Sequence, residues 1–363
     1  MPDANTPVHS SLLKLVETYN NFEKTSDYWE FGYFKGDAWQ KLGLIRSQDA
    51  NLLQELRMPL KEYLSFHVSA KVDEEPNRVQ LDSTHLEKSK TFVNAIKEIR
   101  QILSPEKDAR GGKFVQNLWA DEEEMWPLYG TDIETGFLCG LSPVFGIVTT
   151  GVHLNIYKRD DDSFRIWVAR RSDKKSFAGM YDQCAAGGYQ YKLMEPDFAQ
   201  YGESHDTSTK TCIKREVKEE LRGGLKKDWI NDVKGPHAIQ YAYIRDARSG
   251  SLANTPELGV KIAYDLELNE EPNLDKFNTD EVKCIETKSV RQIIELLLAD
   301  QFKPNCALIM VDFLIRLGCL DDDIASGDDI RTMREMLEQH PAVEYLPHWE
   351  LDQETNTTGK LSR

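Results

Sequence analysis

The 363-residue sequence predicts an α/β protein with an α+β sandwich of mixed sheets flanked by helices, preceded by a smaller α+β domain. Two observations carry this prediction. In the second half, alternating β-branched segments are interspersed with segments of helical periodicity, without the strict βαβ repetition of a doubly wound sheet. In the first half, two aromatic-rich strand segments stand among amphipathic helices. We therefore expect an N-terminal domain over 1–135, a larger domain over 136–320 and an acidic tail over 321–363.

The elements of the first part follow from periodicity. Leucines recur along one side of 10–24, which predicts an amphipathic helix. Residues 28–44 hold two candidate strands, and 70–85 is polar and irregular. Two further segments are expected to be helical: 49–66 and 86–103.

The second part opens on a predicted hairpin. Residues 143–159 and 164–172 alternate around the turn Asp160-Asp161-Asp162-Ser163. Glycine-rich phosphate-binding motifs of the GxGxxG and GxxxxGK[ST] types are missing from the sequence, so it supports neither a dinucleotide fold nor a P-loop. The remaining candidate strands are 237–247, 259–268 and 280–287. The remaining candidate helices are the segment around 213–221, 289–300, 303–317 and 328–339.

Composition limits the partners. The formal net charge of −16 argues against a broad surface for nucleic acid or for an anionic membrane. The 6 cysteines contain no CxxC pair, which argues against a zinc ribbon or a disulfide framework and favours reduced thiols in the cytoplasm. The first residues lack the pattern of a signal peptide, and no apolar run reaches the length of a membrane span. We expect a small-molecule partner, no nucleic acid and no membrane; the sequence does not indicate the oligomeric state.

An acidic segment, Arg-Glu-Val-Lys-Glu-Glu-Leu-Arg-Gly-Gly over 215–224, is the main candidate site. Glu216, Glu219 and Glu220 are spaced i, i+3, i+4, so a helix places their carboxylates in one sector. Such hard oxygen ligands suit Mg²⁺ or Mn²⁺, with positions left for water and phosphate. The alternative is a solvated helix face, stabilised by an Arg215–Glu219 pair. Three residues form the adjoining apolar stripe that would anchor the helix: Ile213, Val217 and Leu221.

Together with Gly187-Gly188 and Gly202-Glu203, the segment REVKEEL resembles the Nudix box. The flanking stretches FGIVTTGVHLNIY, ARRSDKKSFAGMYDQCAAGG and FKPNCALIMVDFLIRLG are similar to the thiamine-associated Nudix branch of fungi and plants. That branch is related to thiamine pyrophosphokinase fusions and carries an extra N-terminal domain. The resemblance implies a Nudix fold and a Mg²⁺-dependent hydrolase of diphosphate bonds. An oxidised thiamine diphosphate, cleaved to its monophosphate, is one candidate substrate.

The resemblance also implies roles for particular residues. Glu216, Glu219 and Glu220 would ligate the metal, and Glu216 would also orient or deprotonate the attacking water. Glu281, before the last predicted strand, is the candidate general base, with a solvated loop acid as the alternative. The residues expected to bind the substrate are Arg170, Arg171, Lys175, Gly187 and Gly188. For the three cations, an ordinary basic strand end is the alternative.

The box also departs from the family pattern. Thr207 stands where a glutamate is expected, and Arg222 stands where a glycine is expected. The loop between Gly188 and Arg215 is expanded on both sides of Gly202. These departures motivate a second hypothesis, a repurposed Nudix-fold isomerase, cyclase or lyase whose substrate has no diphosphate. The sequence is also compatible with hydrolysis of a prenyl or nucleoside diphosphate, and with a binding module without chemistry.

Overall fold

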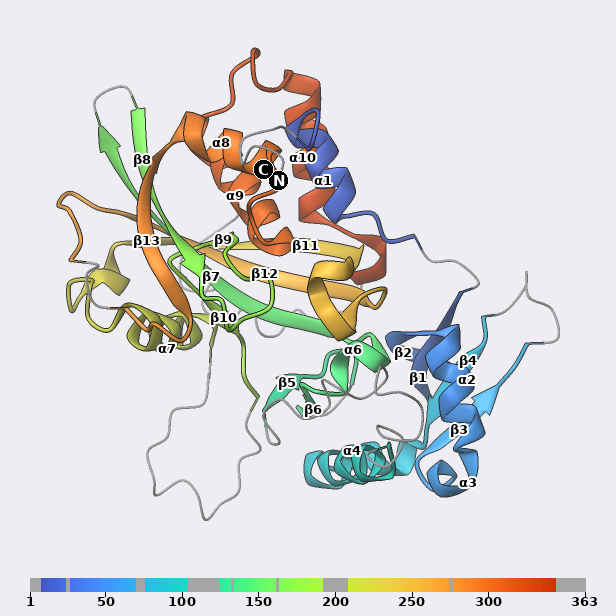
Figure 1. Cartoon of the computed structure of the whole chain (residues 1–363). Helices are drawn as coiled ribbons and strands as arrows, with labels where there is room; N and C mark the ends of the chain where they lie inside the picture. The colour runs from blue at the N-terminus through green and yellow to red at the C-terminus, as the bar shows by residue number, and fades with distance from the viewer. Residues whose placement is uncertain are drawn as a thin grey trace.

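A computed structural model describes residues 8–23, 27–69, 76–103, 124–131, 134–160, 163–191, 208–273 and 277–343. Within these ranges the chain forms a four-stranded sheet, a larger mixed sheet and a short two-stranded hairpin, with helices packed around them (Figure 1). The predicted fold class, mixed sheets flanked by helices, is therefore confirmed. The domain boundaries at 135 and 320 stay a prediction.

The four-stranded sheet has the order β2-β1-β4-β3, with β1 antiparallel to β2 and parallel to β4. Its core is aromatic: Phe31 and Phe92 each lie within about 6 Å of the ring of Phe137, which comes from the short hairpin. The hairpin therefore closes the core of this sheet. The strands are β1 (Tyr28–Lys35), β2 (Ala38–Arg46), β3 (Leu64–His67), β4 (Arg78–Leu81), β5 (Met125–Pro127) and β6 (Gly136–Leu138). The helices are α2 (Ser47–Glu55), α3 (Arg57–Leu60), η1 (Ser83–Leu86), α4 (Ser89–Leu103) and α6 (Ser142–Phe145).

The predicted helix over 49–66 is wrong beyond its first part. The helix α2 ends at Glu55, α3 is a separate turn, and the segment from Leu64 belongs to strand β3. Pro59 explains the break, because its ring has no N–H to donate and clashes with the carbonyl of residue 55 in a continuous helix. The segment 70–85, predicted to be irregular, contains strand β4, whose four residues are too short for a periodicity signal.

The larger sheet has the order β11-β12-β7-β8-β13, with β10 on β7 and β9 on β8. Strand β7 is its centre: it runs parallel to β12 and antiparallel to β8 and β10. The predicted hairpin is formed by β7 and β8. The strands are β7 (Val148–Asp160), β8 (Ser163–Arg171), β9 (Tyr181–Asp182), β10 (Ala185–Gly188), β11 (Val233–Ile244), β12 (Pro256–Glu267) and β13 (Val282–Ser289).

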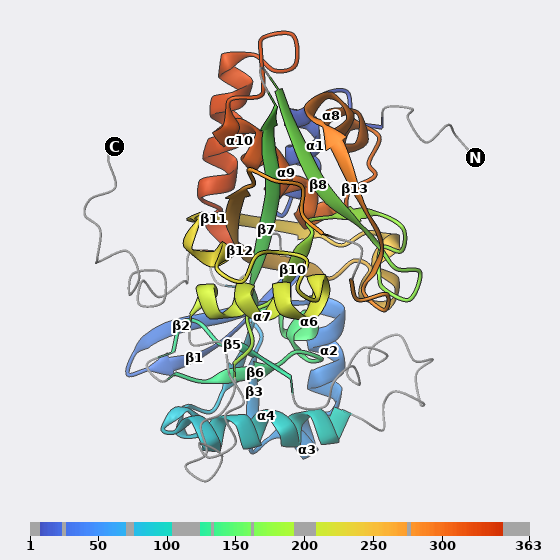
Figure 2. The ribbon, with the colours of Figure 1, turned by 90° about the vertical axis from the view of Figure 1, so that its left-hand side faces the viewer.

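Helices cover both faces of the larger sheet. In Figure 1, α7 lies below it, and α1, α8, α9 and α10 gather above it. The turned view in Figure 2 shows the same group of four helices apart from α7. Alternation along β7 divides its residues: Val152 and Leu154 pack in the core with α7, whereas Tyr157 packs in the core with α9. All five helices match predicted segments, and four of them lie in the second part of the chain: α7 (Thr209–Leu221), α8 (Val290–Leu298), α9 (Pro304–Leu317) and α10 (Gly327–Glu338).

The helix α1 (Leu12–Tyr19) belongs to the core of the larger sheet, although it precedes the four-stranded sheet in the sequence. Its buried Leu12, Leu15 and Val16 pack with α9 and α10. The larger sheet is therefore completed by residues from both ends of the described chain. None of the described helices has the length and apolar character needed to cross a membrane.

Candidate functional site

Helix α7 presents the predicted acidic residues. Ser208 caps its first turn, because the Ser208 hydroxyl accepts from the Thr211 N–H and the Thr211 hydroxyl bonds back to the Ser208 N–H. The predicted apolar stripe is buried against the sheet, which fixes the rotation of the helix about its axis. The stripe consists of Ile213, Val217 and Leu221.

The three glutamates of α7 have different environments. Glu216 is buried, Glu220 is partly buried, and the side chain of Glu219 is 55% exposed. Glu220 Oε2 accepts a hydrogen bond from the Ala186 N–H of strand β10 at 3.1 Å. Two carboxylates are thus held between the helix and the sheet, and the third stands at the solvent edge.

Arg215 ties the acidic face to strand β10. Its guanidinium lies 2.7 Å from Glu216 Oε1 and 3.3 Å from Glu219 Oε2, and it donates to the Gly188 carbonyl oxygen at 2.9 Å. These contacts fix the direction of the Glu216 carboxylate. Arg215 therefore acts on the acids and on the strand, rather than extending as a free cation.

The glycine pair of β10 allows two close approaches. A Cβ on Gly187 would lie 2.1 Å from the Glu216 carboxylate, and one on Gly188 would lie 1.8 Å from the Trp126 ring. Any larger residue would displace these groups. The sequence needs Gly187-Gly188 because a carboxylate and an indole pack directly on the strand.

The acids repel one another. Burial, followed by the charges of Asp182 and Glu216, raises the pKa of Glu220 well above its usual value, and Glu281 adds to the effect. A divalent cation would relieve this repulsion, and carboxylate oxygens are the ligands that Mg²⁺ prefers. The chemistry of the donor set therefore fits the expected metal.

The predicted basic residues are engaged elsewhere. Arg171 donates to Asp182 Oδ2 at 2.7 Å, and the Arg170 guanidinium lies 4.7 Å from the ring centre of Tyr181. The Lys175 ammonium lies 2.5 Å from Glu281 Oε1, which brings the candidate general base together with a candidate substrate residue.

A cavity of about 440 Å³ adjoins the glycine pair. Among the described residues that line it are Gly187 and Gly188, whereas the three predicted cations are not among them. Different cations line it instead: Lys261 of β12, Arg245 after β11 and Lys303 before α9. Aromatic rings of Trp126 and Phe177 form part of its wall.

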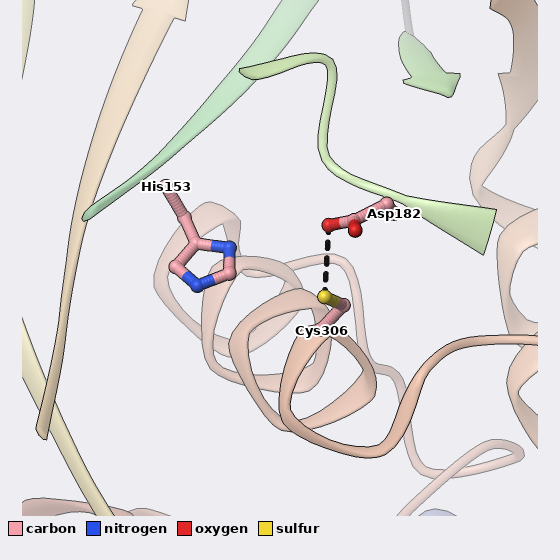
Figure 3. A group of neighbouring side chains, drawn as sticks. All are labelled: His153, Asp182 and Cys306. Atoms are coloured by element: carbon pink, nitrogen blue, oxygen red, sulfur yellow. Dashed lines mark hydrogen bonds between the residues drawn. The ribbon is translucent and has the colours of Figure 1, made fainter. Parts of the chain in front are cut away.

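His153, Asp182 and Cys306 form a second polar group beside this cavity (Figure 3). Their side-chain atoms that could bind a metal ion lie within 4.8 Å of one another. Each already has a protein partner. The Cys306 thiol donates to Asp182 Oδ1 at 2.8 Å, and Arg171 occupies Asp182 Oδ2. Burial, followed by the charge of Asp182, raises the pKa of the Cys306 thiol, so it stays protonated. The group is a closed hydrogen-bond network and a poor metal site.

The same network fixes His153. The Gln183 side-chain amide donates to the Cys306 carbonyl, so its oxygen faces His153 Nδ1 at 2.9 Å and accepts the Nδ1 proton. Burial lowers the pKa of His153 to about 3. His153 is therefore neutral, with Nε2 as the ring nitrogen that can accept a hydrogen bond.

Comparison with known proteins gives partial matches. No protein-family model matches the chain. An uncharacterized protein of Saccharomyces cerevisiae is 35% identical over 48% of this chain and 48% of its own length. Nudix hydrolases 20 and 24 of Arabidopsis thaliana, both chloroplastic, are 29% and 26% identical over 49% of this chain, and over 41% and 43% of their own lengths. The matches thus span about half the length of these relatives. The two plant matches support a relationship to the Nudix hydrolase superfamily. The thiamine-associated branch stays a prediction.

Of the positions where the box departs from the family pattern, the structure describes Arg222. Arg222, in place of the expected glycine, takes a left-handed conformation with φ of 44° at the C-cap of α7. Gly202, Glu203 and Thr207 lie outside the described residues.

The sequence reasoning missed the cavity residues Lys261, His153 and Lys303. A signal was present: Lys261 interrupts the apolar run of a strand that is buried on both faces. His153 and Lys303 lie in VTTGVHLN and KPNCAL, two of the stretches that carried the resemblance.

Proposed function

We propose that this protein is a Mg²⁺- or Mn²⁺-dependent hydrolase that cleaves the diphosphate bond of a small molecule. The observation that carries the proposal is the pair Glu216 and Glu220, held against the glycine strand with a raised pKa at Glu220. Structural ion pairs have no need for such repulsion, whereas metal sites commonly gather like charges.

The proposed ligands are Glu216, Glu220 and, at the solvent edge, Glu219. A bound divalent ion would neutralise charge on the phosphoryl oxygens and acidify the attacking water. Arg215 holds Glu216 in position through its 2.7 Å contact. Lys175 holds Glu281 in the same way, and Glu281 keeps its proposed role as general base. The contacts of Arg170 and Arg171 favour positioning roles over direct contact with phosphate.

The cavity suggests the kind of substrate. Trp126 and Phe177 line the cavity, and aromatic side chains suit a planar heteroaromatic ring better than a flexible prenyl chain. An oxidised thiamine diphosphate and a nucleoside diphosphate derivative both carry such a ring. We propose the first as the leading candidate, because the flanking sequence resembles the thiamine-associated branch.

The test is a phosphate-release screen over thiamine, nucleoside and prenyl diphosphates, with and without Mg²⁺. Glu216→Gln and Glu220→Gln each remove one proposed ligand charge, so each is expected to lower turnover at least a hundredfold while the protein stays folded. Glu335→Gln, on the exposed side of α10, is the matched control. Full activity in both Glu216→Gln and Glu220→Gln would refute the proposal.

A second function is favoured by a specific observation. Neutral His153 and the buried Lys261 line one cavity, and both can exchange protons without a metal. An isomerase, cyclase or lyase acting on a substrate without a diphosphate would use such a pair. Turnover that persists in excess EDTA and is lost in His153→Gln would support this second function over hydrolysis.

A further inference from the structure

Lys261 is a buried cation whose ammonium has no acid within ion-pair distance in the described part of the chain. It lies on β12, between β11 and β7, and is 8% exposed. Its ammonium makes neither a hydrogen bond nor an ion pair with any residue that the structure describes. Because burying an unpaired charge is costly, its presence at a cavity wall calls for a compensating group that enters the cavity.

Glu257, which lines the same cavity, attracts the charge of Lys261 but does not lie within ion-pair distance of it. Glu257, two residues before Gly259 on the same strand, accepts hydrogen bonds from Tyr241 at 2.5 Å, Tyr243 at 3.2 Å and Arg245 at 2.9 Å. The Glu257 carboxylate is thereby satisfied by β11 and the loop after it. Lys261 is left beside the cavity.

Two other hydrogen-bond donors of the cavity also lack an acceptor among the described residues. The Ser249 hydroxyl is buried, lines the cavity and has no hydrogen-bond partner among the described residues. The Lys303 ammonium has no ion pair within those residues either, and Lys303 caps the start of α9, where helix N–H groups favour an anion. Two ammonium groups and a hydroxyl thus face one space as donors without acceptors.

Backbone geometry makes room for this arrangement. A Cβ on Gly151 of β7 would lie 3.3 Å from Lys261 Nζ, so glycine keeps that space open. Gly151 pairs with Gly188, whereas Gly187 pairs with Val152. Because neighbouring residues point to opposite faces of a strand, Lys261 and Glu216 lie on opposite faces of the sheet. The cavity reaches the backbone of Gly187, which packs on Glu216.

We propose that Lys261, Lys303 and Ser249 form an oxyanion subsite at the start of α9 that binds a phosphate group of the cavity's ligand. A phosphate offers several acceptor oxygens to donors that arrive from different elements, which matches a set drawn from β12, η3 (Ala247–Leu252) and α9. The subsite rests on the proposed function and deepens it: it would hold one phosphate group of the diphosphate ligand in the cavity that reaches Gly187.

The test is calorimetric titration of the full chain with inorganic phosphate and with pyrophosphate, in EDTA. Lys261→Met keeps the length and removes the charge, and is expected to weaken phosphate binding about 10- to 100-fold. Lys226→Met removes an equal charge from an exposed position and is expected to bind as the wild type does. Equal phosphate affinity in Lys261→Met and the wild type would overturn the proposal.

Two further arms keep the outcomes distinct. Acetate that binds as tightly as phosphate, and is lost in Lys261→Met, would overturn the assignment to phosphate in favour of a carboxylate. Ser249→Ala and Lys303→Met, at positions that touch the cavity from other elements, are each expected to lose part of the affinity. Binding is measured in EDTA and hydrolysis in Mg²⁺. Phosphate binding without diphosphate hydrolysis in Mg²⁺ would refute the hydrolase and leave the subsite standing, whereas hydrolysis in Mg²⁺ without phosphate binding in EDTA would do the reverse.

Discussion

Lys261→Met is expected to stabilise the folded protein at neutral pH. Burial, reinforced by Lys303 and Arg245, outweighs the attraction of Glu257 and lowers the pKa of Lys261 from its usual 10.5 to about 8. Each factor of ten in the proton dissociation constant is worth about 1.4 kcal/mol, so the fall corresponds to about 3 kcal/mol against the folded state at pH 7. Methionine keeps most of the side-chain volume and removes this electrostatic cost.

The pH dependence separates this effect from packing. A cation whose pKa is lower in the folded state holds fewer protons there than in the unfolded chain between pH 8 and 10.5, so the wild type gains stability as the pH rises through that range. The advantage of Lys261→Met should therefore fall from about 3 kcal/mol at pH 7 to about 1.5 kcal/mol at pH 9.5.

The measurement is urea unfolding of wild type and variant at both pH values, followed by circular dichroism. Lys226→Met, at an exposed position, is the control and is expected to show no comparable gain. A variant less stable than the wild type at pH 7 would contradict the reasoning, as would an advantage that does not change with pH. Either result would mean that Lys261 has a compensating partner.

Three further predictions concern the site. Gly187→Ala should lower phosphate release at least tenfold, because its Cβ would displace the Glu216 carboxylate, whereas Gly327→Ala meets no atom within 4 Å and should leave activity unchanged. Arg222→Gly should raise the free energy of unfolding by about 1 kcal/mol, measured in urea, since glycine adopts the left-handed C-cap without strain; an equal or lower value would show that the arginine contacts outweigh the strain. His153→Gln should flatten the loss of stability between pH 6.5 and 3, because the folded pKa of about 3 lies below the usual 6.5 and the wild type loses stability as the pH falls through this window; parallel curves for both proteins would contradict this.

Local sequence patterns predicted the elements that are long enough to show a helical or strand periodicity. The acids and the stripe of α7 follow from spacing alone, as do the β7–β8 hairpin and α9. The prediction failed over 49–66, where the single residue Pro59 ends a pattern that is otherwise helical. It also failed for β3 and β4, whose four residues each are ordered by β1 and by each other.

The acidic and the basic residues of the site differ in whether the sequence alone predicts that they lie close together. Glu216 and Glu220 share a helix face, so the spacing brings them together before any tertiary contact forms. Lys261 and Lys303 are separated by a strand, a loop and α8, and they meet only once α9 packs on the sheet. Arg171 was indistinguishable from them by sequence, because its partner Asp182 is supplied by the separate strand β9.

The charges of the two faces are complementary as well as separate. Beside α7, burial and the charges of Asp182 and Glu216 raise the pKa of Glu220; near the start of α9, burial and the charges of Lys303 and Arg245 lower the pKa of Lys261. On either face, burying charges of the same sign together costs free energy. The cavity lined by Lys261 and Lys303 reaches Gly187 of β10, and the Glu216 carboxylate packs against that glycine. A metal-bound organic diphosphate carries both kinds of charge that these groups would bind, a divalent ion for the carboxylates and a phosphate for the ammonium groups.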